Sequence, residues 1–308
     1  MDFQCRLCAF AEGETWAVRD AKSLDRLVMG LCARCGLVQQ LNMPTDEALK
    51  IYYAHHYRQD YKKTYEPKLK YVQRAGHAAL DRLRFIKTHL KADRTLRLLD
   101  IGAGGGEFVY LSRKHGFEAS GVEPNEGYAQ YAQKTYGVDI RTQMFDELDA
   151  ACSDVVTLFH VFEHMANPQA VMKKLADVLT DDGVLVIEVP NLLQGDASPH
   201  NIFFKAHLFY YCRYTLAAAA SRYFDVLQIE DAGNLKAIFR KRRQVAAQLQ
   251  LPDQQALAHI RRRLSQKGWV EYVLLGGGWR KPFKRLARMW SERQLKGLAA
   301  RQVLDQLT

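Results

Sequence analysis

The sequence lacks any long apolar run. A helix that spans a membrane needs roughly 18 consecutive apolar residues, whereas the nearest stretch, 215–221 with its four alanines, is far shorter. The segment from Met1 to Cys5 contains neither an apolar run nor a small-residue cleavage site, so it does not resemble a signal peptide. We therefore expect a cytoplasmic protein without a transmembrane segment.

Cysteine is also scarce, with six among 308 residues, which argues against a disulfide framework in a cytoplasmic chain. Four of the six form two C-x2-C pairs, one at Cys5 and Cys8 and the other at Cys32 and Cys35. Two such pairs supply the thiolates of a closed tetrahedral zinc site, which has no open position for catalysis. The spacing predicts one structural Zn²⁺ bound by these four residues; four unrelated buried cysteines are the alternative.

Acidic residues are few in the last quarter of the chain. From Lys236 to Thr308 there are 17 lysines and arginines against 4 acidic residues, a net charge of +13, which leaves the remainder at −3 of the overall +10. Residues 276–290 add two tryptophans and a phenylalanine to these cations, as interfacial helices do. We expect this basic extension to contact an anionic surface; a helix that packs its apolar side on the main domain is the alternative.

A glycine-rich turn follows an apolar strand near Asp100. Gly102, Gly104 and Gly106 would let a ligand approach the backbone closely, as nicotinamide, flavin and adenosylmethionine sites all require. Asp100 would repel the pyrophosphate of a dinucleotide, whereas the ammonium group of a sulfonium amino acid gains from a carboxylate. Glu123 ends the next apolar run about 20 residues further on, where a ribose-binding acid belongs. The pattern predicts S-adenosylmethionine as the cofactor; a solvated acid at a strand end is the alternative for Glu123.

The run from Asp100 to Gly106 resembles motif I, D-x-G-x-G-x-G, of class I S-adenosylmethionine-dependent methyltransferases. The resemblance implies an α/β fold with a Rossmann-like sheet closed by an antiparallel hairpin. After the strand that enters the glycine turn, apolar runs predict strands at 118–124, 138–145, 154–160 and 183–190, and the hairpin at 224–229 and 234–240. The resemblance also implies cofactor contacts from Asp100, Gly102, Gly104, Gly106, Glu123, Pro124, Phe145, Phe159 and His160; for Phe145 a place in the core is an equal alternative.

Three parts are therefore expected. A small N-terminal zinc ribbon covers residues 1–60, the methyltransferase domain with a helical lead-in covers 61–243, and a basic helical extension covers 244–308.

Two nucleic-acid motifs are absent from the region after residue 160. There is no Asn-Pro-Pro-aromatic element of the kind found in enzymes that methylate base nitrogens, and no Pro-Cys nucleophile of the cytosine C5 type. The pair Glu163-His164 resembles instead the Glu-His segment of small-molecule O- and C-methyltransferases. Such an acceptor loses a proton as it attacks the methyl group, and a neutral imidazole is a suitable base. The candidate bases are His160, His164 and His207; a structural role at a helix start is the alternative for Glu163 and His164.

The first sixty residues resemble the zinc-binding domain at the front of sugar C-methyltransferases, most specifically in the run Cys-Gly-Leu-Val-Gln from Cys35 to Gln39. Those enzymes act on nucleotide-linked deoxysugars and carry a Tyr-His-Glu-His run whose Tyr and last His serve proton transfer. Here the run reads Phe204-Lys205-Ala206-His207. The resemblance thus gives His207 the role of base while the Tyr is missing; a histidine that locks a lid onto the sheet is the alternative.

The sequence predicts a methyltransferase that modifies an oxygen or carbon of a small molecule, with a sugar or nucleotide-linked sugar as one candidate acceptor. An RNA-modifying methyltransferase that grips phosphates through the zinc domain and the basic extension is the alternative. A catalytically silent scaffold of the same fold is a third hypothesis.

Overall fold

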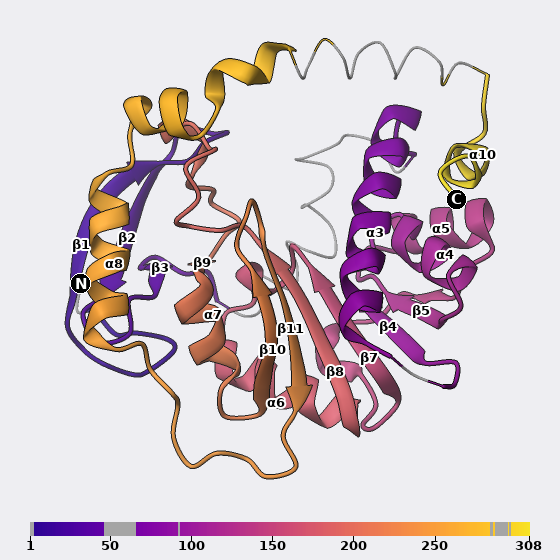
Figure 1. Cartoon of the computed structure of the whole chain (residues 1–308), viewed down its shortest axis with the longest axis horizontal. Helices are drawn as coiled ribbons and strands as arrows, with labels where there is room; N and C mark the ends of the chain where they lie inside the picture. Colours follow the sequence, from indigo (N-terminus) through magenta and orange to yellow (C-terminus); the bar gives the residue numbers. More distant parts are fainter. Residues whose placement is uncertain (1–2, 46–65, 92, 284–285, 287–294, 296) are drawn as a thin grey trace. The chain divides into compact units, whose positions relative to one another are not determined.

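The computed structural model describes residues 3–45, 66–91, 93–283, 286, 295 and 297–308. The chain forms two compact units, and each draws on several stretches of sequence (Figure 1). Unit 1 comprises Met1–Met43, Phe159–Ala176 and Ile187–Lys284, and unit 2 comprises Pro44–Leu158, Asp177–Val186 and Arg285–Thr308. The predicted domain boundary at residues 60 and 61 lies outside the described residues, as does most of 284–290 in the predicted interfacial stretch.

A seven-stranded sheet has the order β10-β11-β8-β7-β4-β5-β6. Its parallel strands pair β7 with β4, β4 with β5 and β5 with β6, and the hairpin of β10 and β11 is antiparallel. The central strands are nearly continuous apolar runs because both faces of a parallel sheet are covered. The predicted fold class, a Rossmann-like sheet closed by an antiparallel hairpin, is confirmed. The strands are β4 (Arg97–Ile101), β5 (Glu118–Val122), β6 (Ile140–Arg141), β7 (Ser153–Phe159), β8 (Leu179–Val189), β10 (Phe224–Glu230) and β11 (Leu235–Lys241).

Helices follow the strands as right-handed crossovers require. The start of α5 shows how local sequence fixes one of them: the Asn125 side chain accepts a hydrogen bond from the Tyr128 backbone N–H at 3.2 Å, and Gly137 ends the helix with a φ of +68°. Glu123 is thereby held directly ahead of a fixed helix start. The helices are α3 (Leu69–His89), α4 (Glu107–Lys114), α5 (Glu126–Tyr136), α6 (Pro168–Val178) and α7 (Arg213–Ala220).

A second, four-stranded antiparallel sheet carries the cysteine pairs. It consists of β1 (Gly13–Arg19), β2 (Arg26–Cys32), β3 (Val38–Gln40) and β9 (Phe209–Tyr210), in that order. The last strand comes from the segment just after His207, so the N-terminal sheet is completed by a distant part of the chain. This small sheet with its cysteine cluster matches the predicted N-terminal module.

The C-terminal extension begins with α8 (Gln254–Ser265), which lies against the small sheet (Figure 1). Ile260 of α8 packs in one cluster with Met29 and Val38. Gly36 in the second cysteine pair has a φ of +72°, and a Cβ there would lie only 2.7 Å from Ile260 Cδ1, so glycine is needed for both conformation and packing. This helix therefore packs its apolar side on the body of unit 1.

The extension continues through the π-turn η5 (Glu271–Leu275) and the 3-10 turn η6 (Gly278–Arg280) and ends in α10 (Ala300–Asp305). Within unit 2, α10 packs against α3: a Cβ on Gly76 would lie 2.7 Å from Leu304 Cδ2. Asp305 accepts a hydrogen bond from the Tyr110 hydroxyl at 2.5 Å. None of the described helices is long and apolar enough to cross a membrane.

One predicted strand is shorter in the structure. The strand expected at 138–145 is limited to Ile140–Arg141, and Phe145 begins the 3-10 turn η2 (Phe145–Glu147). The Glu147 carboxylate accepts a hydrogen bond from the Met144 backbone N–H at 3.0 Å, which favours a turn over continued pairing at this edge of the sheet.

Candidate active site

The glycine turn between β4 and α4 forms a tight backbone cradle in unit 2. Gly102, Gly104 and Gly106 all have positive φ, at +73°, +55° and +84°. A Cβ on Gly106 would lie 2.7 Å from the Ala132 Cβ, so this glycine also permits close packing of α5. Side chains at these positions would strain the turn and obstruct the cradle.

Asp100, at the end of β4, is almost fully buried beside this turn. It accepts a hydrogen bond from the Thr157 hydroxyl at 2.6 Å. Burial nevertheless raises the pKa of Asp100 to about 7. A buried carboxyl group of this kind would be stabilised in its charged form by a cationic ligand.

Glu123, after β5, is bound to the turn by a direct hydrogen bond. The Gly104 backbone N–H donates to one carboxylate oxygen at 2.9 Å, and the Asn125 N–H donates to the other at 3.1 Å. Each oxygen keeps a further lone pair for a ligand hydroxyl. The cradle, the buried acid and this doubly anchored carboxylate fit the amino acid and ribose parts of S-adenosylmethionine.

The remaining predicted cofactor residues occupy strand ends. Pro124 and Phe145 in unit 2 are both half-buried, and for Phe145 this disfavours a place in the core. Phe159 and His160 belong to unit 1 at the end of β7 and are also half-buried. Contact of any of these residues with the cofactor stays a prediction.

His160 is the centre of a charged cluster in unit 1. Its φ is +58°, a strained conformation for a residue other than glycine. Its Nε2 lies 3.1 Å from Glu188 Oε1, and its Nδ1 lies 3.5 Å from Glu163 Oε1. Burial lowers the pKa of His160, but the close carboxylate of Glu163 and the hydrogen bond to Glu188 outweigh this and raise it to about 9. The raised pKa favours the charged imidazolium at neutral pH, and a role of His160 as a base stays a prediction.

Glu163 is a buried carboxylate that lies close to the rings of His160, His164 and His207. Neither of its oxygens has a hydrogen-bond partner among the described residues. Burial alone would raise the pKa of Glu163, but the histidines around it, His160 above all, lower this pKa to about 2. His164 donates its Nδ1–H to the Ala206 carbonyl at 2.7 Å, which turns its Nε2 toward Glu163 at 3.9 Å. These contacts fit a His164 that holds the 203–208 loop in place.

His207 differs from both other histidines. Its ring stands edge-on to that of His164, with centroids 4.9 Å apart, and it is half-buried. Burial and the neighbouring His164 lower the pKa of His207 to about 4, so it is neutral at pH 7. Glu163, His164 and His207 also place three ligand atoms within 4.8 Å of one another, a set that could hold a divalent cation.

A family model described as a methyltransferase domain matches residues 55–242, more than half of the chain. The chain belongs to the methyltransferase-domain family. A ubiquinone biosynthesis O-methyltransferase of Coxiella burnetii is 27% identical over 117 residues, which cover 36% of this chain and 50% of that protein. The protein of the same name from Azorhizobium caulinodans is 29% identical over 109 residues, covering 33% and 43%. This methyltransferase chain spans about half the length, or less, of these curated relatives.

Parts of the chain are similar to solved methyltransferase structures. The magnesium protoporphyrin IX methyltransferase of Synechocystis has a TM-score of 0.48 at 14% identity and matches 64% of this chain and all 100% of its own. An S-adenosylmethionine-dependent methyltransferase from Mesorhizobium loti has a TM-score of 0.44 at 14% identity, covering 51% and 96%.

The cysteine pairs of the methyltransferase come together as predicted. The Sγ atoms of Cys5 and Cys35 are 3.5 Å apart, those of Cys8 and Cys32 are 3.6 Å apart, and all four lie within 4.8 Å of one another. Zn–S bonds of about 2.3 Å give tetrahedral edges of roughly 3.8 Å, whereas a disulfide needs about 2.05 Å. The four thiols therefore fit a zinc ion and form no disulfide.

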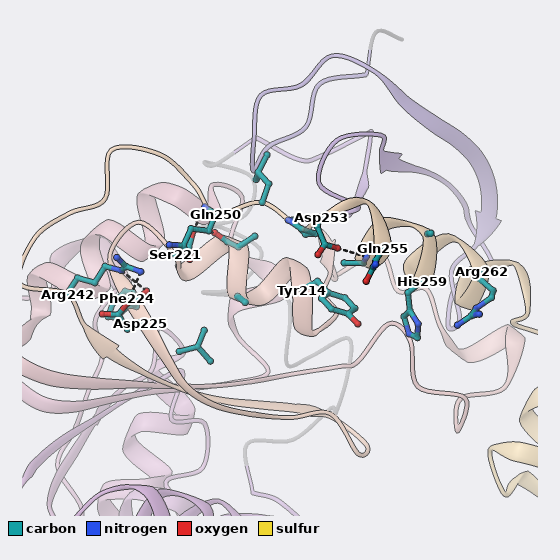
Figure 2. A pocket seen from close by; sticks show the side chains of 17 residues that line it. Tyr214, Ser221, Phe224, Asp225, Arg242, Gln250, Asp253, Gln255, His259 and Arg262 are labelled. Carbon is teal, nitrogen blue, oxygen red and sulfur yellow. Dashed lines mark hydrogen bonds and ion pairs between the residues drawn. The ribbon is translucent and has the colours of Figure 1, made fainter.

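A separate hollow of about 870 Å³ lies between α7, the start of β10 and α8 (Figure 2). Arg242 at its edge pairs with Asp225 at 2.7 Å, and Asp253 caps α8. Residue 224 begins β10 and pairs with residue 241, at the far end of the hairpin from its turn. None of the predicted site residues lines this hollow.

Sequence reasoning missed two residues of the charged cluster around His160, which are Glu188 and Asn234. Asn234 donates its side-chain N–H to Glu188 Oε1 at 2.9 Å, so it orients the acid that holds His160. A single Glu in the apolar run 183–190 is a visible signal for Glu188, because an acid is rarely buried in a central strand without a partner. Asn234 lies in a hairpin turn, where asparagine is common for backbone reasons alone.

Proposed function

We propose that this chain transfers a methyl group from S-adenosylmethionine to an oxygen or carbon of a small molecule. The observation that carries the proposal is the half-buried His207, whose ring nitrogen lies within 4.8 Å of the buried Glu163 carboxylate, in a chain with a methyltransferase domain. The bound cofactor supplies an electrophilic methyl group on a sulfonium.

The chain's own residues would prepare both partners. The glycine turn and Asp100 hold the amino acid part of the cofactor, and Glu123 accepts from the ribose hydroxyls. His207 takes the acceptor proton on a ring nitrogen, and the negative charge of Glu163 stabilises the imidazolium that results. His160, already protonated, serves as a fixed positive group rather than as a base.

An oxygen acceptor is favoured over carbon. A single neutral histidine suffices for a hydroxyl, whereas carbon needs an already acidic C–H or a second proton-transfer group, and Phe204 stands where sugar C-methyltransferases have Tyr. The names of the curated relatives point to O-methylation as well. The proposal of a sugar acceptor is supported by the cysteine cluster and by the resemblance of the first sixty residues to sugar C-methyltransferases.

The deciding experiment uses cell extract incubated with the protein and methyl-labelled cofactor, followed by mass spectrometry. A labelled small molecule that is absent when heat-inactivated protein is used is the expected result. Label in RNA would favour the RNA-modifying alternative. A protein that binds no cofactor by calorimetry would favour the silent scaffold.

The four cysteines and the basic C-terminal extension each have a proposed ligand. We infer that Cys5, Cys8, Cys32 and Cys35 bind one structural Zn²⁺, since their sulfur geometry fits that ion. We also infer that the basic C-terminal part of the chain contacts an anionic surface, because residues 236–308 carry a net charge of +13.

A further inference from the structure

The segment 269–283 exposes the apolar side chains that a soluble segment normally buries. Trp269, Val270, Leu274, Trp279 and Phe283 are between 51% and 73% exposed. The acid of the same segment, Glu271, is instead 7% exposed and pairs with Arg263. The usual polarity is inverted: the carboxylate faces inward and the large apolar groups face water. Concentrated exposed apolar groups mark interaction sites.

Several contacts hold this apolar face, residues 269–283, on the rest of unit 1. Arg263 and Lys267, just ahead of the face, donate to the Leu193 carbonyl at 3.1 Å and to the Gln194 carbonyl at 2.7 Å. Lys281 within the face donates to the Asp196 carbonyl. A Cβ on Gly276 would lie 2.0 Å from the Gly195 carbonyl oxygen, so the two backbones are in close contact. The exposed groups therefore stand on a fixed support, the loop 191–202 that follows β8.

Cations predominate beside the apolar face, with the exposed Asp196 of the loop 191–202 as a neighbouring acid. Arg280 stacks over the Trp279 ring at 4.8 Å, and Lys281 lies 5.0 Å from the Tyr272 ring centre. Glu271 is the only acidic residue of the sequence between 267 and 283, and its charge is buried. Tryptophan and phenylalanine flanked by lysine and arginine fit the boundary between acyl chains and anionic headgroups.

We propose that the apolar face docks on an anionic lipid bilayer. A second copy of the same basic face would be repelled by its own charge. RNA would use the cations and aromatic rings but would gain little from the exposed aliphatic groups of Val270 and Leu274, which a bilayer buries at about 25 cal/mol per Å². An anionic bilayer would interact favourably with the cations, the aromatic rings and the aliphatic side chains.

If the chain has the proposed function, docking of the apolar face would also determine which acceptors can reach the site. Lys281 of the apolar face donates to the Asp196 carbonyl of the loop 191–202, and this loop follows the end of β8, where Glu188 contacts His160. Docking would hold this acceptor-side loop at the membrane surface. The acceptor would then be an amphipathic molecule that resides at the interface.

The test measures binding of the whole 308-residue chain, loaded with zinc, to vesicles without cofactor or acceptor. Co-sedimentation with phosphatidylcholine vesicles that contain phosphatidylserine, and little with phosphatidylcholine alone, is expected. The triple variant Val270→Ser, Leu274→Ser, Trp279→Ser should bind at least tenfold more weakly. Val226→Ser with Val245→Ser is the matched control, because these valines are 47% and 58% exposed elsewhere, and it should bind like the parent.

Melting temperature and zinc content check that each variant is folded. The proposal is overturned if the parent ignores anionic vesicles, or if the triple variant and the valine control bind equally. Loss of a dimer in the triple variant, without vesicle binding by the parent, would identify a second copy as the occupant. Salt-sensitive binding to bulk RNA alone would identify nucleic acid. Because no methyl transfer is measured, these outcomes are independent of the proposed activity.

Discussion

His160 and His207 carry different charges because their neighbours differ. His160 lies between two carboxylates, which raise its pKa to about 9, whereas His207 faces His164 and is partly desolvated, which lowers its pKa to about 4. At pH 7 the first is an imidazolium and the second a neutral base. The sequence listed three candidate bases and favoured His207 through a family resemblance; the surroundings of His160 and His207 in the structure separate these two by charge.

A pH profile tests the assignment to His207. Because its pKa is lowered, the neutral form persists as pH falls, and turnover at saturating cofactor should stay level from pH 8 to about 5 and decline toward pH 4. His207→Ala should cut turnover by roughly 10²-fold with cofactor affinity intact. His77→Ala, on an exposed position of α3, is the control and should leave the profile unchanged. A decline centred near pH 6.5 would contradict the assignment.

The proposed contact of Glu123 with the cofactor ribose can be tested by substitution. Glu123→Ala should weaken S-adenosylmethionine binding by more than about tenfold, because it removes a charged acceptor for the ribose hydroxyls and the anchor of the Gly104 N–H. Glu126→Ala, three residues later on the exposed side of α5, should bind the cofactor normally. Calorimetry compares the two variants. Equal affinities would show that the ribose lies elsewhere.

At the scale of elements, the sequence was informative where structure is local. Apolar runs and the glycine turn predict β4, β5 and β7 because each is a continuous stretch with its own period. The pairing of β9 with β3 was not predictable, since it joins residues 209–210 to residues 38–39 through only two pairs. The turn just after β6 contains a hydrogen bond that the Glu147 carboxylate accepts from the Met144 N–H, a contact that no pattern in the sequence indicates.

The N-terminal sheet braces the loop that carries His207, and Gln40 is the main contact. Its side-chain Nε2 lies 2.6–3.1 Å from the carbonyl oxygens of Phe204, Lys205 and His207. Asp20 accepts from the Lys205 backbone N–H at 2.5 Å. Gln40 is buried, so no water replaces these bonds at low cost. It is a positioning residue for the proposed base.

Gln40→Met should therefore lower turnover about tenfold or more while cofactor affinity and zinc content stay normal. The neighbouring Gln39 provides a matched contrast, because its side chain bonds the backbone of Gln4 and Arg6 beside the first cysteine pair. Gln39→Met should affect zinc retention more than turnover per zinc-loaded molecule. If both variants lose zinc and activity in parallel, Gln40 acts only through the stability of the module.

At the scale of the whole molecule, the two proposed ligands fall in different compact units. The cysteine cluster lies in unit 1, together with β9 and α8, whereas the glycine turn and Glu123 lie in unit 2. Ligand binding stabilises the backbone that it orders. Zinc and S-adenosylmethionine should thus protect separate parts of the chain.

Hydrogen exchange can resolve the two effects. Chelation of zinc should speed exchange in β2 and β3 and also in β9 and α8, since β9 pairs with β3 and Ile260 of α8 packs on the same sheet. Added S-adenosylmethionine should slow exchange at Gly102–Gly106 and at Asn125, whose N–H bonds Glu123. A quadruple Cys→Ser variant should hold no zinc and should exchange like the chelated protein, whereas the parent should contain about one zinc per chain. Full zinc content in that variant would refute the cysteine site. Chelation that left β9 and α8 protected would show that the metal orders the cysteine loops alone.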